Sequence, residues 1–210
     1  MDTTWFRMLG SIPRRAPPCQ TDAVPSPVEI PALVSRTLDL SRQRGFISST
    51  RHETGRLLAT LAATREGTLA ELGTGTGVGS AWLSSGAAAG TRIVSAELDT
   101  SLAADVQKIF AAVDNVEIVP GDWSTLERYA PFSLLFVDVR EVMADIDVLA
   151  GLIEPGGIAV LDDFVPSSAW PPIVDGQVDT IREQWLTDDR FIAVEMMISV
   201  DASLLIAARR

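Results

Sequence analysis

The chain has 210 residues, of which 47% are hydrophobic, and a formal net charge of −11 at pH 7. This length is enough for one well-packed domain and short for two. Such an acidic surface repels phosphate backbones and no Lys/Arg cluster offsets it, so a small molecule is a better candidate partner than nucleic acid. No apolar run approaches the length of a membrane span, and no membrane partner is expected.

The N-terminal part of the chain is rich in proline, and residues 1–28 are predicted to form an extended arm before one domain over residues 29–210. The opening residues lack a sustained apolar core, so a secretory signal is not expected. Cys19 is the single cysteine, which excludes an internal disulfide and a Cys-based metal site. We therefore expect a cytoplasmic protein, and the arm would allow a homodimer.

Two amphipathic helices are predicted next, at Val28–Arg44 and His52–Ala63, as a cap that precedes the main sheet. Short apolar runs then alternate with helical segments. The expected strands are Thr68–Leu72, Arg92–Ala96, Val116–Val119, Ser133–Val137 and Ile158–Leu161. The expected helices are Gly79–Ala89, Ser101–Ala112, Val142–Ile153 and a further one near Ile173–Trp185.

This alternation predicts an α/β fold with a Rossmann-like, doubly wound sheet. The last two apolar runs, Phe191–Ile198 and Ser203–Ala208, are separated only by a short turn. Two strands that close together form an antiparallel hairpin, because a parallel pair needs a long crossover. The sheet is therefore expected to be mostly parallel, with an antiparallel C-terminal strand.

A glycine-rich turn follows the first expected strand, in the sequence LAELGTGTGVGSAW at residues 69–82. Such a turn lets a ligand approach the backbone, although it could also be only a tight turn. A dinucleotide fingerprint would need a third glycine at Val78 or Ser80, and a phosphate loop would need a lysine that this stretch lacks. The spacing therefore disfavours both of those ligands.

The remaining pattern, E-L-G-T-G-T-G, resembles the first motif of class I S-adenosylmethionine (SAM)-dependent methyltransferases. The resemblance implies that Glu71, Gly73, Gly75 and Gly77 line the methionine end of SAM. Glu71 would accept from this zwitterion directly or through water.

The second expected strand ends at Glu97, where a carboxylate can accept hydrogen bonds from both ribose hydroxyls. Asp99 is the rival, and Glu97 is preferred because it ends the apolar run. After the third strand come Asp122 and Trp123. In the family an Asp here accepts from the adenine amino group and its neighbour packs on the ring, whereas the alternative is an ordinary Gly-Asp turn with Trp123 in the core.

Two further strand ends carry acids, Asp138 after the fourth and Asp162–Asp163 after the fifth. In an open α/β sheet these ends converge, and carboxylates that close repel each other unless a cation or protons intervene. The arrangement resembles the catechol and caffeoyl-CoA O-methyltransferases. It implies that Asp138, Asp162 and Asp163 hold a divalent ion such as Mg²⁺, that Asp138 and Asp162 serve catalysis, and that Asp138 also faces SAM. Alternatively, Asp162 begins a turn, Asp163 faces solvent and Asp138 serves only the cofactor.

The sequence departs from that group at the general base. Its members carry a lysine three residues after the first metal-binding Asp, and this chain has Glu141 there. Arg140 stays protonated, so it is no base. His52 is another candidate, although a histidine at a helix start is more often a surface residue. The proton would leave to water or a carboxylate, or the acceptor would be an already acidic phenol.

We therefore expect SAM-dependent methyl transfer to a hydroxyl of a small molecule, assisted by a divalent ion. A metal-independent N- or carboxyl-methyltransferase is the first alternative. A SAM-binding regulatory protein without turnover is the second. A nicotinamide oxidoreductase ranks last, because both glycine spacings fail and the chain ends in a hairpin.

Overall fold

A computed structural model describes residues 29–46 and 49–210. The proline-rich arm with Cys19 lies outside the described residues, and so does the basis for the predicted homodimer. In the described residues no helix is long and apolar enough to cross a membrane.

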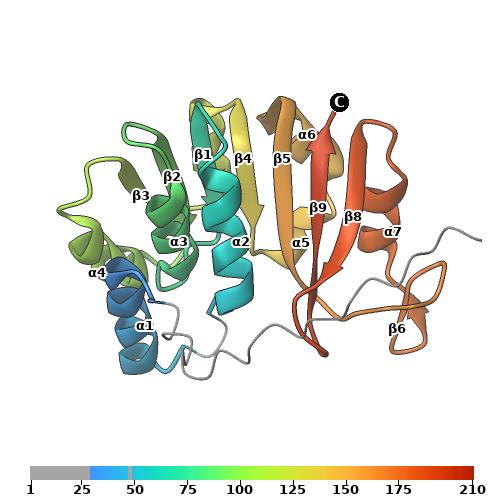
Figure 1. The fold of residues 1–210 in the computed structure, drawn as a ribbon, viewed down its shortest axis with the longest axis horizontal. Coiled ribbons are helices and arrows are strands. Elements are labelled where there is room, and N and C mark those ends of the chain that lie inside the picture. Colours follow the sequence, from blue (N-terminus) through green and yellow to red (C-terminus); the bar gives the residue numbers. More distant parts are fainter. Residues whose placement is uncertain (1–28, 47–48) are drawn as a thin grey trace, which may run out of the picture.

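The main sheet has seven strands in the order β3-β2-β1-β4-β5-β9-β8 (Figure 1). Their bounds are β1 Thr68–Leu72, β2 Arg92–Glu97, β3 Val116–Pro120, β4 Phe132–Val137, β5 Ile153–Phe164, β8 Phe191–Met197 and β9 Ser203–Arg209. The first five run parallel, and the order reverses between β1 and β4. The carboxyl ends of these strands therefore meet at one edge, and this topological switch point is where α/β sheets bind ligands.

The C-terminal hairpin closes the sheet as predicted. Strand β9 pairs antiparallel with both β5 and β8, so it lies between them. The Rossmann-like, mostly parallel sheet with an antiparallel last strand is thus confirmed.

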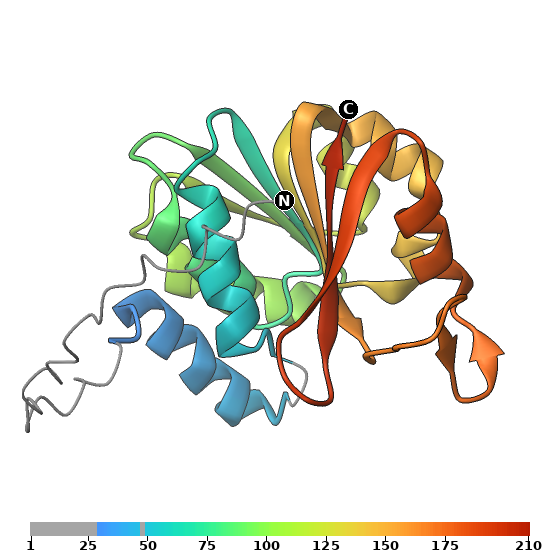
Figure 2. The same cartoon turned by 45° about the vertical axis from the view of Figure 1, so that its right-hand side comes forward.

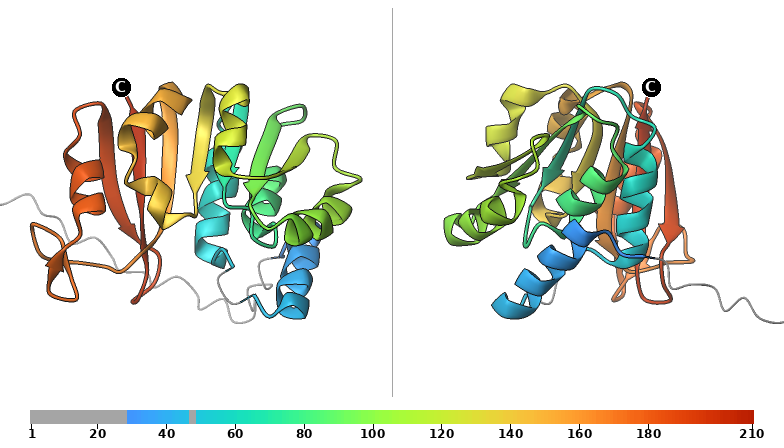
Figure 3. Two further views of the ribbon diagram at one scale, coloured as in Figure 1. Left: turned by 180° about the vertical axis from the view of Figure 1, so that it is seen from behind. Right: turned by 60° about the vertical axis from the view of Figure 1, so that its left-hand side comes forward.

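Two layers of helices cover the sheet (Figures 2 and 3). One face packs against α1 (Ala32–Arg44), α2 (His52–Ala62), α3 (Val78–Gly86) and α4 (Thr100–Phe110). The other face packs against the 3₁₀ helix η1 (Trp123–Tyr129), α5 (Arg140–Met143), α6 (Ile146–Leu152) and α7 (Thr180–Thr187). The expected cap is therefore part of a layer, because α2 packs on α3, and α1 packs on α3 and α4.

Two predicted helices differ from the structure. The helix expected near Ile173–Trp185 is confirmed only in its second half, which belongs to α7, and its first half is a small hairpin of β6 (Ile173–Val174) and β7 (Gln177–Val178). Asp175 and Gly176 form its turn with φ values of 50° and 78°, a conformation that Asp-Gly favours in tight hairpins. The helix predicted over Val142–Ile153 is divided into α5 and α6, and Ile153 already belongs to β5.

Candidate functional site

A cavity of about 330 Å³ opens at the carboxyl ends of the central strands. Seven predicted site residues line it, namely Gly73, Gly75, Glu97, Asp122, Trp123, Asp138 and Asp163. They lie at the carboxyl ends of β1 to β5 or directly after them. The topology thus brings together residues that lie far apart in the sequence.

The glycine-rich turn forms one wall of this cavity. Gly73 and Gly75 have φ values of 92° and 53°, which a side chain would strain. The amides of Gly73 and Thr74 donate to the carbonyl of Ala96 at 3.2 and 3.0 Å, which fixes the turn against the end of β2. Gly77 lies deeper, since a Cβ there would be 2.8 Å from Val106, and it does not line the cavity.

Glu97 lies at the end of β2 and faces this cavity. One carboxylate oxygen accepts from the amide of Gly75 at 2.8 Å, and the other accepts from the amide of Asp99 at 2.9 Å. Each oxygen retains a lone pair for a further donor. Asp99 instead caps α4, because its carboxylate accepts from the amides of Ser101 and Leu102. The structure therefore places Glu97, and not its rival, on the cavity wall.

Asp122 and Trp123 form the wall next to β3. The amide of Ser124 donates to the Asp122 carboxylate at 3.0 Å, and this bond lowers the pKa of Asp122. Trp123 is half-buried and packs against the core while also lining the cavity. The structure therefore shows the Gly-Asp turn and the packing of Trp123 against the core, while both residues also face the cavity, where their contact with an adenine ring stays a prediction.

Glu71 does not line the cavity, which disfavours the direct contact with the ligand that was one of its two predicted modes, the other being a contact through water. Its side chain is 1% exposed and accepts from the hydroxyl of Ser95 at 2.7 Å and from that of Ser80. Burial raises its pKa to about 7, against hydrogen bonds from Ser80 and Ser95 that lower it. A Cβ on Gly79 would lie 2.0 Å from its carboxylate. Glu71 therefore ties β1 to β2 and to the start of α3.

A second cavity of about 440 Å³ adjoins the first and shares Asp138 with it, and Asp163 as well. Its lining consists of Ser49, Thr50, Arg51, Asp138, Asp162, Asp163 and Ala202. All three acids predicted as metal ligands thus face one polar space. Arg51 supplies a cation on the same wall and lies 3.4 Å from Asp201 of the β8–β9 turn.

The two neighbouring acids belong to a bulge in β5. Leu161 pairs with Leu205 and Phe164 pairs with Ser203. Asp162 and Asp163 lie between these paired positions without partners of their own in β9, which is the arrangement of a β-bulge. Asp162 is 6% exposed, and the Thr54 hydroxyl at 3.4 Å is the only side chain within the described part of the chain that donates to it. Asp163 has a φ of 65° and is exposed.

The electrostatics of these acids favour a positive charge in the second cavity. Burial raises the pKa of Asp138 to about 8, and the nearby Asp162, Glu71 and Asp163 raise it further in that order. Burial is also the main reason that the pKa of Asp162 is raised. The oxygen donors suit a hard divalent ion. Over the described residues, however, no three His, Cys, Asp or Glu side chains are already arranged as an ion-binding group.

The candidate bases lie elsewhere. Glu141 is exposed on α5, and Arg140 beside it donates to Asp179 at 3.1 and 3.2 Å. His52 is exposed with its ring edge-on to Trp82, and it lines neither of the two cavities.

Sequence reasoning missed several residues that line the two cavities, among them Phe46 and Arg51. Both belong to the connection between α1 and α2, where no motif marks them. The Phe46 ring lies against Gly75, since a Cβ there would be 3.2 Å from it, and it lines the first cavity. The only feature of the sequence that set Arg51 apart was its position directly before a predicted helix.

No family model matches the sequence, and no curated protein does. Several solved structures share the fold. An O-methyltransferase from Bacillus cereus in complex with SAH (S-adenosylhomocysteine) has a TM-score of 0.72 and 20% identity, over 87% of this chain and 93% of that one. TomG from Streptomyces achromogenes, an O-methyltransferase involved in tomaymycin synthesis and bound to SAM, has a TM-score of 0.69 and 21% identity, over 87% and 92%. The SAH-bound methyltransferase PaMTH1 from Podospora anserina has a TM-score of 0.69 and 19% identity, over 86% and 89%. At these identities the likeness establishes the fold.

Proposed function

We propose that the protein is a SAM-dependent methyltransferase that transfers a methyl group to a hydroxyl oxygen of a small molecule. The observation that carries the proposal is the Glu97 carboxylate, which faces the first cavity with both oxygens oriented by backbone amides. A carboxylate at the end of the second strand is suited to the two hydroxyls of a ribose. Solved structures with the same fold hold SAM or SAH.

The rest of the first cavity suits the other parts of SAM. Gly73 and Gly75 leave room for the amino-acid end close to the backbone. Asp122 would accept from the adenine amino group, and Trp123 would pack on the ring. Glu71 acts indirectly, because it holds the start of α3 through Ser80.

The second cavity is proposed as the acceptor site. It adjoins the first through Asp138 and Asp163, so an acceptor there lies beside the methyl donor. Asp138, Asp162 and Asp163 would hold a divalent ion, which would lower the pKa of a bound hydroxyl. Arg51 would favour an acceptor with a negatively charged group near that hydroxyl.

Titration calorimetry with SAH tests the cofactor assignment, and an absence of binding at high protein concentration would refute it. A titration with Mn²⁺ tests the ion. We expect Asp162→Ala to abolish Mn²⁺ binding and to leave SAH affinity unchanged. Asp39→Ala is the matched control, since this exposed acid of α1 pairs with Arg42, lines neither of the two cavities and should leave both affinities unchanged. Equal Mn²⁺ affinity in the two variants would remove the ion from the proposal.

A metal-independent N- or carboxyl-methyltransferase is the second candidate. It is favoured by the lack of a ready-made ion-binding group among the described residues. Methyl transfer that persists with excess EDTA would support it. A SAM-binding regulatory protein would bind SAH with the same affinity and transfer no methyl group to any acceptor in a hydroxyl and amine panel.

A further inference from the structure

We propose that Arg182, Asp179 and Arg140 form a clamp that fixes the ends of β4 and β5 relative to each other, and so positions the acids of the second cavity. This inference rests on the proposed function for the role of those acids. The three residues are positioning residues, since none of them lines either of the two cavities.

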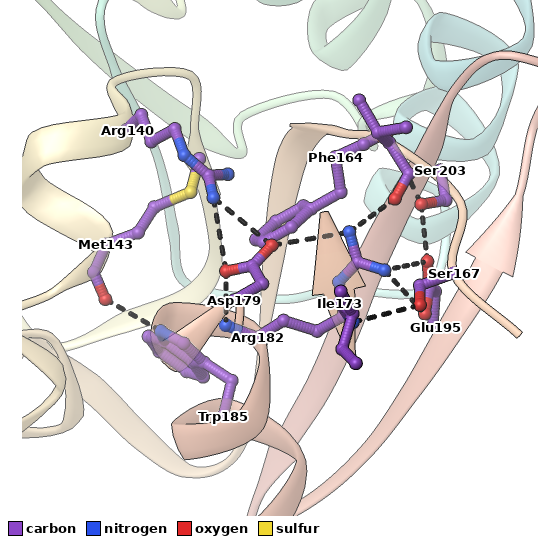
Figure 4. A network of polar contacts seen from close by, with 11 residues as sticks. Arg140, Met143, Phe164, Ser167, Ile173, Asp179, Arg182, Trp185, Glu195 and Ser203 are labelled. Atoms are coloured by element: carbon purple, nitrogen blue, oxygen red, sulfur yellow. Dashed lines mark hydrogen bonds and ion pairs between the residues drawn. The ribbon is translucent and has the colours of Figure 1, made fainter. Parts of the chain in front are cut away.

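Arg182 is the centre of the clamp (Figure 4). It lies on α7, is 0% exposed and pairs with Asp179 at 3.3 Å and with Glu195 of β8 at 3.1 Å. Its guanidinium also donates to the carbonyl of Val165, two residues beyond the bulge acids. Arg182 therefore connects α7, β8 and the end of β5.

Phe164 brings the end of β5 into the same cluster. The centroid of its ring lies 5.0 Å from the guanidinium of Arg140 and 5.3 Å from that of Arg182, so the ring makes a cation–π contact with each arginine (Figure 4). Phe164 directly follows Asp163 and is 2% exposed. Its backbone carbonyl accepts from Ser203 of β9 at 3.4 Å. The residue after the acids is thereby held by its ring and by its backbone.

Asp179 closes the link to β4. It accepts from Arg140 at 3.1 Å and pairs with Arg182, and it also caps α7. Arg140 lies two residues after Asp138, at the start of α5. The segment after Asp138 therefore meets the segment after Asp163 directly, through the Phe164 ring, and indirectly, through Asp179 and Arg182. A shift of either strand end breaks contacts of the other.

The composition of the clamp favours a positioning role over a purely stabilising one. Burying charged groups costs free energy that an apolar cluster of the same size would not lose. Arg182 Nε is also buried without a hydrogen-bond partner among the described residues. Charged groups fix direction and distance, which an apolar cluster would leave looser.

Arg140→Gln tests the clamp, because the Arg140 side chain is 43% exposed and its loss leaves the buried Arg182 paired. Arg190→Gln is the matched control. Arg190 is 41% exposed and pairs with Asp147 and Asp188, away from both strand ends. Arg140→Lys restores the charge and should recover part of the effect. Hydrogen exchange of the metal-free proteins, Mn²⁺ affinity and SAH affinity are measured for all four proteins.

We expect Arg140→Gln to speed amide exchange in residues 162–165 and to weaken Mn²⁺ binding by at most about tenfold, the lower limit for a lost direct partner of a metal ligand, because Arg140 acts on the acids only through their neighbours. SAH affinity should stay within about twofold, and Arg190→Gln should match the parent. Equal exchange rates of residues 162–165 in Arg140→Gln and Arg190→Gln would overturn the clamp. If the parent binds Mn²⁺ and Arg140→Gln binds it with the same affinity, the clamp is likewise overturned. A parent that binds no Mn²⁺ refutes the ion instead, and exchange then decides on the clamp alone.

Discussion

Replacing Glu97 by Ala is the sharpest test of the cofactor site. The substitution removes both carboxylate oxygens from the end of β2 while leaving the strand and the glycine-rich turn in place. The amides of Gly75 and Asp99, which donate to those oxygens at 2.8 and 2.9 Å, lie beside an open cavity. Water can reach them, so the fold should survive the substitution.

The magnitude follows from the hydrogen bonds that the ribose would lose. A bond to a charged acceptor contributes about 1.5–3 kcal/mol. Since about 1.4 kcal/mol changes an affinity tenfold, one lost bond weakens SAH binding by about 10- to 100-fold and two weaken it further. Glu97→Gln keeps one acceptor oxygen, and we expect it to fall between the parent and the Ala variant.

The assay is titration calorimetry with SAH, and Asp99→Ala is the control. Asp99 caps α4, so its loss should lower the free energy of unfolding by about 1 kcal/mol and leave SAH affinity unchanged. If Glu97→Ala binds SAH like the parent, the ribose contact lies elsewhere. If Asp99→Ala loses binding instead, the two acids have exchanged roles.

Three further predictions concern Glu71, Trp123 and Gly79. Burial raises the pKa of Glu71 from 4.5 to about 7, so the folded protein favours the protonated carboxyl. The free energy of unfolding should therefore fall by about 3 kcal/mol as the pH rises from 4.5 to 7. Urea unfolding from pH 4.5 to pH 8 should therefore show the parent losing stability relative to Glu71→Gln, and parallel curves would contradict this. Trp123→Ala should weaken SAH binding by about 0.5–1.5 kcal/mol through lost ring packing, measured by the same calorimetry. Gly79→Ala should destabilise the fold by about 1–3 kcal/mol, because its Cβ would lie 2.0 Å from Glu71 and 2.9 Å from Phe136, whereas Gly151→Ala in α6 meets nothing within 4 Å and should not destabilise it.

The strands of the sheet were predictable because each is a short apolar run that ends at glycine or acid. The five predicted parallel strands begin or end within two residues of the observed ones, except for β5. That strand begins at Ile153, five residues before the predicted start, because Gly156 and Gly157 interrupt its apolar pattern. The same reasoning located the acids, since residues that follow parallel strands gather at one edge.

The burial of Glu71 could also have been inferred from its strand. Successive side chains of a strand point to opposite faces, so Glu71 shares a face with Leu69. Leu69 belongs to the core beneath α3, and that is where Glu71 meets Ser80. The motif indicated the correct strand end but not the face of the sheet.

The β6–β7 hairpin was missed for a different reason. An Asp-Gly pair between Val174 and Gln177 is a strong turn signal, but the flanking strands have only two residues each and leave no alternation to read. The clamp was beyond prediction, because Arg140, Phe164, Asp179 and Arg182 meet only through tertiary packing. Spacing along the chain carries no sign of such a cluster.

The clamp bears on how a proton could leave the proposed acceptor. The turn after β4 carries Arg140, which is engaged by Asp179, and Glu141, which is exposed, so neither supplies the base that the resemblance would place there. Arginine remains protonated at any working pH. Carboxylates and the hydroxyls of Ser49 and Thr50 are then the proton acceptors that line the second cavity. Since a carboxylate is a weak base towards an ordinary phenol, the acceptor hydroxyl must be acidic in its own right or made acidic by a bound cation. Under the proposed function, a dependence on an ion and the acidity of the acceptor would therefore be linked.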